Sequence, residues 1–451
     1  MLERFFRLSD NHTDVRTEVR GGIVTFMTMA YILAVNPSVL SSTGMNPDAV
    51  LIATAVSSFA ACLIMGLVSN YPMALAPAMG LNAYMAYTVC GSMGFSWQAA
   101  LFAVFLEGII FIILSLTNVR EMMFNAIPLS LKKGISAGIG LFIAFIGLQN
   151  AGIVQDNTST LVAIVDFSAS IHSTGICAAL AIIGVAVIAV LSSKNVKGAI
   201  LIGILTTWGL GILCQMTGVY LIDAENGFGS LIPELRTVNI GAIRETFGAC
   251  FRIGRNISIP DLIAIMCAFL FVDLFDTLGT LIAVAGKAGL LDKEGRLPNI
   301  KKALFADAIG TTVGAVMGTS TVSTYVESSS GVSEGARTGL ASVVTGIMFL
   351  LSVFLAPLFV AVPGFATAPA LIYVGFLMIG TVKDLDFDDL ADSIPAYLTI
   401  IFMPLTYSIS DGIAAGVIFY TILNMMSGKR ERVSPMLCVL TVLFILKFAL
   451  M

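Results

Sequence analysis

The most constraining feature of the sequence is a succession of apolar runs, separated from one another by glycine, proline or charged residues. A helix needs about 20 apolar residues to cross the hydrocarbon core of a bilayer. Only 24 basic and 28 acidic residues are spread over 451 positions, roughly half the share that a soluble domain carries. The sequence therefore predicts an all-α polytopic membrane protein with about 14 transmembrane segments and one further apolar run, and excludes a globular cytosolic protein. The runs lie near residues 21–40, 49–69, 72–90, 97–117, 134–149, 173–192, 198–217, 260–286, 300–317, 319–333, 337–357, 366–382, 393–409, 411–427 and 434–450.

Lysine and arginine in the short loops predict the orientation, because positive charge is retained on the cytoplasmic side. With the N-terminus in the cytoplasm, the basic loops all fall on that side, and the loop 150–172 between them contains no lysine or arginine. We therefore expect a multi-pass protein of the plasma (cytoplasmic) membrane. The run 434–450 would carry the C-terminus outside, and a half-buried or interfacial segment is the alternative. The cytoplasmic residues in this scheme are Arg120, Lys132, Lys133, Lys194, Lys197, Lys287, Lys293, Arg296, Lys301, Lys302, Lys429, Arg430 and Arg432.

The remaining composition excludes other classes of protein. Seven cysteines have no metal-ligand spacing, and His12 and His172 lie in polar flanks, neither with a local cluster of potential metal ligands. We expect no metal and no cofactor. A net charge of -4 without a basic patch gives no reason to expect nucleic acid.

A polar stretch near the middle divides the chain into two similar parts. Residues 1–217 form a predicted first repeat, 218–259 a connector, 260–432 a second repeat, and 433–451 an extra apolar C-terminal segment. Seven spans in each repeat would give the two repeats opposite orientations, as in many secondary transporters. Chance alignment of apolar sequences is the alternative, but polar positions also correspond. At an offset of 245 residues the matched pairs are Thr28 with Asp273, Gly44 with Gly289, and Asn82 with Glu327.

Acids inside apolar runs are informative, because an ionisable side chain is costly there and usually faces a cavity or a partner. Asp273 and Asp276 are three residues apart in FLFVDLFDTLGT and share one face of a helix. Glu107 and Asp307 are single acids in other runs. For these two, a hydrogen bond to a neighbouring helix is the expected role.

Two spans have sequences that oppose a continuous helix. In GTSTVSTYVESSSGVSEGARTG, residues 318–339, hydroxyl and β-branched side chains compete with helical backbone bonding. Its counterpart NYPMALAPAMGLNAYMAY contains two prolines and Gly80 just before Asn82. Broken spans at matching places of two repeats indicate a binding site. Asn82 and Glu327 follow the two breaks, where free backbone N–H groups suit a small flat ligand with donors and acceptors.

The motifs DNHTDVRTEVRGGIVTFMTMAYIL, APAMGLNAY, FVDLFDTLGT and STYVESSSGVSEGARTG occur in this order and resemble those of the adenine-guanine-hypoxanthine permeases. These belong to the second nucleobase:cation symporter family, which includes xanthine/uracil permease-like proteins. The resemblance covers essentially the whole chain. It implies proton-driven purine uptake by fourteen spans in two inverted repeats. Spans 1–4 and 8–11 would form a core domain, spans 5–7 and 12–14 a gate domain, with short strands in spans 3 and 10. A homodimer also fits the family, although nothing in the sequence requires one.

Carried over residue by residue, the resemblance implies that Asp273 contacts the purine with support from Asp276. Glu327 would hydrogen-bond the ring N–H groups, Asn82 would lie near the base, and Asp307 would brace the core from behind the site. Departures from the family pattern are the run 434–450 and the acids Asp384, Asp386, Asp388 and Asp389. The predicted substrate-binding set is Asp273, Glu327, Asn82, Asp276, Ser328, Gly80 and Thr28.

A buried carboxyl can take up a proton near neutral pH, so Glu327 or Asp273 is expected to couple proton and purine fluxes. Guanine and hypoxanthine are favoured because an ionised acid accepts their N1–H, with adenine as a further candidate. An anion exchanger or channel of the same fold is the alternative, but its nearest fixed cation is Arg337. A membrane enzyme is a third reading, opposed by the lack of a phosphate-binding loop. Phe275, Tyr84 and Tyr325 could stack on a purine or pack between helices.

Overall fold

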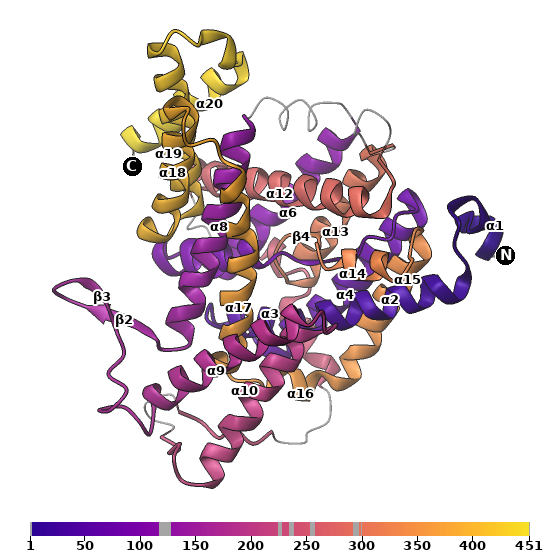
Figure 1. Ribbon diagram of the computed structural model, residues 1–451, viewed down its shortest axis with the longest axis vertical. Helices are drawn as coiled ribbons and strands as arrows, with labels where there is room; N and C mark the ends of the chain where they lie inside the picture. Colours follow the sequence, from indigo (N-terminus) through magenta and orange to yellow (C-terminus); the bar gives the residue numbers. More distant parts are fainter. Residues whose placement is uncertain are drawn as a thin grey trace.

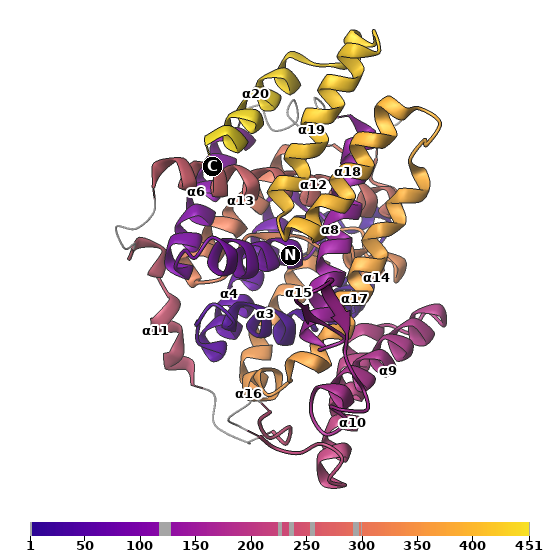
Figure 2. The same ribbon diagram turned by 90° about the vertical axis from the view of Figure 1, so that its left-hand side faces the viewer.

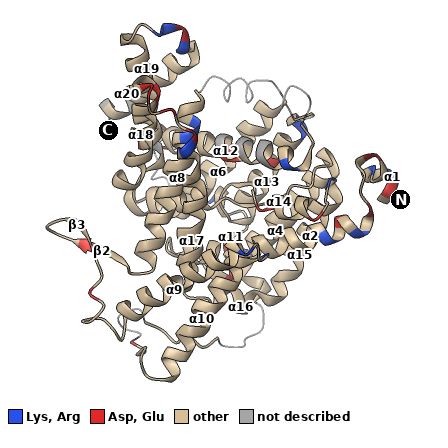
Figure 3. Cartoon of the chain, in the orientation of Figure 1, with Lys and Arg blue, Asp and Glu red and all other residues tan. Residues whose placement is uncertain are grey.

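The computed structural model describes residues 2–116, 128–223, 228–233, 239–252, 258–291, 297–298 and 300–450. Within these residues the protein is mostly helical, and eight helices are long and apolar enough to cross a membrane. Figure 3 shows that Lys, Arg, Asp and Glu occupy a small part of the ribbon, mostly near helix ends and loops. These features confirm a polytopic, mostly helical membrane protein.

Helices and turns of the first half follow the apolar runs closely, and polar residues fix where the helices start. The side chain of Asp14 accepts from the Thr17 N–H at the start of α2, and Ser96 does the same for Ala99 at the start of α6. In order, with 3₁₀ and π turns labelled η, the elements are α1 (Leu2–Phe6), η1 (Ser9–Asn11), α2 (Val15–Met29), α3 (Ile32–Ser41), α4 (Pro47–Ile64), η2 (Met65–Ser69), β1 (Leu75–Pro77), α5 (Met79–Ala83), η3 (Tyr84–Ser92), α6 (Trp97–Ser115), α8 (Leu129–Asn150), β2 (Val154–Asn157), β3 (Leu161–Ile164), α9 (Thr174–Ser193) and α10 (Ala199–Met216).

The second half contains a similar succession. Its first long helix begins where Ser258 accepts from the Asp261 N–H, and ends at Gly289 with φ +68°. Gly44, which the repeat alignment pairs with Gly289, also has positive φ just after α3. The elements are η5 (Ile240–Ala242), α11 (Ile243–Thr246), η6 (Ala249–Phe251), α12 (Ile259–Ala288), α13 (Ile300–Met317), β4 (Val322–Thr324), α14 (Ser328–Ser333), α15 (Gly339–Ser352), η7 (Val353–Leu355), α16 (Ala356–Val360), α17 (Gly364–Ile379), η8 (Gly380–Asp384), α18 (Leu390–Thr406), α19 (Ile409–Met426), η9 (Arg430–Arg432) and α20 (Pro435–Leu450).

The two halves interleave, as Figure 1 shows. Helix α15 packs on α2 and α4, α13 packs on α4 and α6, and α17 packs on α8 and α9. Glycines allow the closest approaches: a Cβ added at Gly339 would lie 2.1 Å from the carbonyl oxygen of Gly66. The core therefore consists of helices from both halves in direct contact.

A buried carboxylate from the first half caps a helix of the second. Glu18 on α2 accepts backbone N–H groups of Arg337 at 2.7 Å, Thr338 at 3.2 Å and Ala341 at 3.2 Å, around the start of α15. Such bonds satisfy N–H groups that the first turn of a helix leaves unpaired. The acid in the DVRTEVRGG motif thus has a structural role, which the sequence did not reveal.

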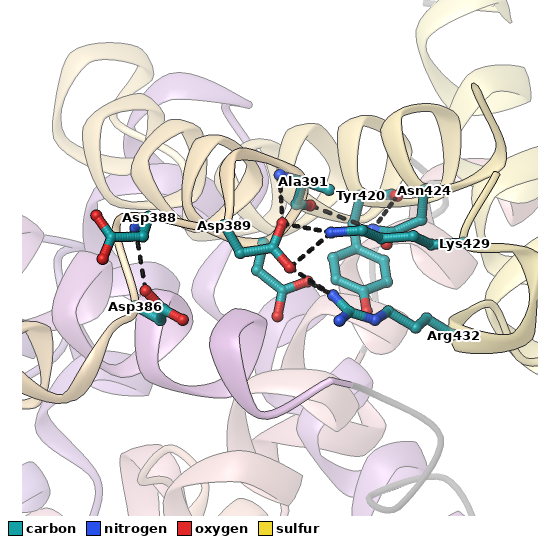
Figure 4. Close-up of polar contacts among 9 residues, drawn as sticks. Asp386, Asp388, Asp389, Ala391, Tyr420, Asn424, Lys429 and Arg432 are labelled. Atoms are coloured by element: carbon teal, nitrogen blue, oxygen red, sulfur yellow. Dashed lines mark hydrogen bonds and ion pairs between the residues drawn. The ribbon is translucent and has the colours of Figure 1, made fainter. Parts of the chain in front are cut away.

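An ion cluster joins the start of α18 to the segment after α19 (Figure 4). Asp389 accepts from the Ala391 N–H at 3.1 Å and pairs with Lys429 at 2.8 Å and Arg432 at 2.7 Å. The acidic run that departs from the family pattern therefore has a structural use. Lys133, near the start of α8, donates to the Asp384 carbonyl at 2.6 Å, so the end of η8 lies next to the first turns of α8.

The predicted connector docks on the core through its short helical turns. Figure 2 shows α11 beside α4, and the Gly248 N–H donates to the Val316 carbonyl at 2.7 Å near the end of α13. A hairpin of β2 and β3, which we did not predict, extends between α8 and α9. Helix α20 packs along α19 and leaves Val439, Val442 and Ile445 exposed.

Candidate functional site

The two interrupted spans meet as a pair of short antiparallel strands. Leu75 of β1 lies opposite Thr324 of β4, and Pro77 lies opposite Val322. The pairing places the hydroxyl-rich stretch, whose side chains favour non-helical backbone, against the proline-containing stretch. The strands predicted in spans 3 and 10 are therefore confirmed.

A short helix follows each strand, and one of the predicted polar residues lies in or next to each of these helices. Asn82 lies in α5 and Glu327 immediately precedes α14. The carboxylate oxygen Oε1 of Glu327 accepts a hydrogen bond of 2.8 Å from the Tyr31 hydroxyl. Tyr31 stands between α2 and α3, so the bend in the first span meets the break in the tenth.

Glu327 lies on the wall of a cavity of about 330 Å³. Thr28 lines the same cavity, and Lys197 and Lys287 approach it from two other elements. A volume near 300 Å³ is at the lower end of small-molecule sites. Of the predicted site residues, Thr28 and Glu327 are those that border this cavity in the described part of the chain.

Helix α12 packs against both β4 and α14, and its acids lie next to them. Asp276 accepts a hydrogen bond of 2.9 Å from Ser323 in the middle of β4. Asp273 is fully buried one turn earlier and accepts from Thr277 at 3.1 Å. The structure thus brings the acids of spans 8 and 10 to the same crossing of broken segments, although Asp273 and Asp276 do not line the cavity that Glu327 borders. Their predicted role in binding a purine stays a prediction.

The hydroxyl of Thr277 also contacts Asp307 of α13 at 2.9 Å. Glu107 of α6 accepts from Thr321, just before β4, at 2.7 Å. Both single acids are therefore hydrogen-bonded to neighbouring elements, in agreement with the role expected for them.

Asn82 is buried behind the strand pair. Its oxygen accepts a hydrogen bond from Ser320, while its amide nitrogen has no hydrogen-bond partner among the described residues. A buried donor without a partner costs free energy, and Asn82 is fully buried and does not border the cavity that Glu327 lines. Its position beside β4 keeps it close to the crossing.

Two other predicted residues contact the protein itself. Ser328 accepts from the backbone N–H of Ala74 at 3.0 Å and so fastens α14 to the segment entering β1. A Cβ at Gly80 would lie 2.9 Å from Ile139 on α8, so glycine permits that helix to approach. Their predicted contact with substrate stays a prediction.

The aromatic residues proposed for stacking have packing roles where they are described. The ring of Tyr84 packs edge-on against Phe269, and the Tyr325 hydroxyl donates to the Pro77 carbonyl at 2.5 Å. The side chain of Phe275 lies outside the described residues. Arg337 was the cation considered for an anion site. Its guanidinium group donates instead to the backbone carbonyls of Val332 and Ala336.

Sequence reasoning missed the hydroxyl groups that hold the acids. Tyr31 stands in an apolar run, and its partner is 296 positions away. Thr277 could have been noticed, because it follows Asp273 by four residues and therefore lies on the same helix face. Lys197 and Lys287 were assigned to loops, and their approach to the cavity depends on tertiary packing.

An interrupted-span site at the crossing of two repeats is typical of secondary transporters. The profile of the Permease family, that of the xanthine and uracil permeases, matches residues 16–415, and the chain belongs to this family. It is therefore a membrane transporter and not an enzyme.

Relatives match over nearly the whole chain. The guanine/hypoxanthine permease PbuG of Bacillus subtilis is 44% identical, over 99% of this chain and 99% of its own. The adenine permease AdeP of Escherichia coli is 43% identical, over 99% of this chain and 96% of its own. The transmembrane domain of the cyanobacterial bicarbonate transporter BicA superposes with a TM-score of 0.64 at 16% identity, covering 89% of this chain and 97% of that domain. This likeness shows a fold of the type built from two inverted seven-segment repeats.

Proposed function

We propose that this protein is a proton-coupled symporter that imports purine nucleobases by alternating access, with guanine and hypoxanthine preferred and adenine as a further substrate. The observation that carries the proposal is the place of Glu327: its carboxylate lies on the cavity wall, at the crossing of β1 and β4, and is held by Tyr31. An ionised carboxylate accepts hydrogen bonds only, which suits ring N–H donors of a 6-oxopurine. Relatives that share its whole length are named for purine bases.

The remaining predicted groups complete a purine site. Asp273 and Asp276 supply acceptors from α12, and the unpaired amide nitrogen of Asn82 supplies a donor for a ring nitrogen or carbonyl. A base lacking the matching group would leave a buried polar group unpaired, which gives selectivity. An acidic side chain of this site would carry the proton, so that the affinity for the purine depends on whether this side chain is protonated.

The cavity walls favour a cytoplasm-facing state. Lys197, just before α10, and Lys287, in the last turn of α12, line the cavity, and the charge pattern assigns both lysines to the cytoplasm. With that orientation Glu327 is reached from inside, where a purine would be released. The N-terminus, the Lys133 loop and the α18–α19 ion cluster would face the same compartment.

An anion exchanger remains the second candidate, because Lys197 and Lys287 place positive charge on the cavity wall. Glu327 on the same wall opposes a bare anion, since like charges repel at short range. The full-length relatives named for nucleobases favour the purine over the anion.

Uptake of radiolabelled hypoxanthine, in cells lacking their own purine permeases, tests the proposal. Unlabelled guanine, hypoxanthine and adenine are expected to compete, and uracil, sulfate and bicarbonate are not. Glu327→Gln should abolish or uncouple uptake, whereas Glu334→Gln, seven residues on in a surface ion pair with Arg20, should retain it. Transport that is driven by an anion gradient and is unaffected by purines would overturn the proposal in favour of the exchanger.

A further inference from the structure

One hydroxyl group joins two carboxyl groups in the middle of the core. Thr277 Oγ1 on α12 lies 3.1 Å from Oδ1 of Asp273 on the same helix and 2.9 Å from Oδ1 of Asp307 on α13. All three side chains are fully buried. Both oxygens are therefore held within hydrogen-bond reach of a single atom.

The chemistry of these groups limits how both contacts can form. A threonine hydroxyl has one hydrogen to donate and lone pairs that accept, whereas an ionised carboxylate only accepts. With both acids ionised, the single hydrogen could serve one oxygen fully, and the two carboxylates would repel each other at short range in a medium of low dielectric. With one acid protonated, its O–H donates to Thr277 while Thr277 donates to the other acid, and both contacts are full hydrogen bonds.

We propose that Asp273 and Asp307 share one proton through Thr277, and that this relay is the element that couples the proton to purine transport. In one state Asp307 holds the proton and Asp273 is ionised. When the Asp307 proton passes to Thr277 Oγ1, the proton already on Thr277 passes to Asp273. The hydroxyl is regenerated, no bond to carbon changes, and the pair carries one negative charge before and after.

The two states differ in what they offer to a ligand. Asp273 is on the helix that packs against β4 and α14, so its ionised state presents an acceptor on the side of the site. The other state places the charge on Asp307 of α13, a helix that also packs against β4. Purine binding and the position of the proton are thereby linked. This inference rests on the proposed purine function and deepens it, because it assigns Asp307 and Thr277 to proton coupling rather than to bracing.

Neighbouring elements hold the relay in place and set its electrostatic surroundings. The Thr277 carbonyl accepts from Thr324 of β4 at 3.3 Å, so the strand pair and the relay are fastened together. The elements packed against α12 and α13 carry charged groups of both signs. They are Asp276 on α12 itself, Glu327 before α14, Glu107 on α6, Asp48 on α4, Arg244 and Glu245 on α11, Asp411 on α19, and Lys132 and Lys133 on α8.

The test compares Thr277→Val, which keeps shape but removes the hydroxyl, with Thr277→Ser, which keeps it. In proteoliposomes, the ratio of proton-driven hypoxanthine accumulation to hypoxanthine exchange should fall about tenfold or more in Thr277→Val, the size expected for a lost bond to a charged group. The bridge stabilises the singly protonated pair, so its loss lets the proton leave more readily and should move the alkaline limb of uptake to lower pH. Thr277→Ser should restore both.

Thr311→Val is the matched control, because Thr311 is a buried threonine of α13 whose hydroxyl donates to the Val322 carbonyl rather than to an acid. Its pH profile should match the wild type. Infrared difference spectra of purified protein supply a readout independent of transport: a protonated-carboxyl band should shift in Thr277→Val and disappear in Asp307→Asn. This decides the matter even where a variant fails to transport.

The outcomes separate the two proposals. Accumulation and a pH profile like the wild type in Thr277→Val, or an unchanged carboxyl band, would overturn the relay while leaving purine transport intact. A wild-type protein that neither binds nor exchanges purines would overturn the proposed function instead.

Discussion

Tyr31 and Glu327 are joined by a hydrogen bond of 2.8 Å between segments 296 positions apart in the sequence. The bond connects the bend of the first span with the start of α14. It holds the carboxylate in one orientation on the cavity wall.

Tyr31→Phe removes this donor without changing the ring. We expect hypoxanthine uptake to lose about tenfold or more in kcat/KM, since a hydrogen bond to a charged group is worth about 1.5–3 kcal/mol. Tyr397→Phe, which alters an exposed tyrosine on α18, is the control and should behave like the wild type. Equal uptake by the two variants would show that Tyr31 does not orient Glu327.

Glu18→Ala removes the acceptor of several backbone N–H groups at the start of α15. We expect a loss of about 3 kcal/mol in stability, because buried donors are left unpaired. Glu334→Ala breaks the ion pair of 2.5 Å with Arg20, in which Arg20 is largely exposed, and should cost less than about 1 kcal/mol. Melting temperatures in detergent compare the two, and an equal shift would contradict the capping role.

Gly339→Ala tests the close approach of α15 to η2. An added methyl group would meet the Gly66 carbonyl at 2.1 Å, so the backbones must separate. We expect a strongly lowered melting temperature and poor recovery of folded protein. Gly209→Ala in α10 meets nothing within 4 Å and should be neutral or stabilising by up to about 1 kcal/mol. A stable Gly339→Ala protein would mean that this contact can relax.

Asp389→Asn tests the ion cluster through its pH dependence. Hydrogen bonds from Lys429 and Arg432 lower the pKa of Asp389 from 3.8 to about 2. A carboxyl whose folded-state pKa is depressed stabilises the fold fully above its unfolded pKa and loses that effect as pH falls through the folded pKa. The difference in melting temperature between wild type and Asp389→Asn should be constant from neutral pH to about pH 5 and shrink below about pH 4. Asp388→Asn, at an exposed neighbour, should show no such difference.

Much of the architecture is local and was therefore predictable. The apolar runs became helices because their length and composition leave few other conformations in a membrane. The two broken spans were visible because Pro72, Pro77 and the hydroxyl residues near Thr321 each weaken a helix at their own position. The hairpin of β2 and β3 was missed, since only the absence of basic residues in that loop had been considered.

The candidate site was predictable by residue type rather than by contact. An acidic side chain in an apolar run costs free energy and is therefore rare, so the sequence alone indicated Asp273, Glu327 and Asp307. Their hydrogen-bond partners were not, because a tyrosine or threonine in an apolar run has no such cost. Of these contacts, the one between Thr277 and Asp273, four residues apart, could have been read from the sequence, whereas the partners of Tyr31 and Thr277 in other spans lie 296 and 30 positions away. The cap formed by Glu18 was hidden for the same reason.

The pairing of β1 with β4 also bears on how the protein is made. Ala78 donates to the Thr321 carbonyl at 2.9 Å and Tyr325 donates to the Ala74 carbonyl at 3.0 Å, so each strand finds its backbone partners in the opposite half. A ribosome that has released the first 300 residues into the membrane has delivered every residue of β1 but none of its partners. The nascent chain must keep that proline-containing segment sheltered until the tenth span arrives, and truncation between the halves should leave an inserted protein without a pocket.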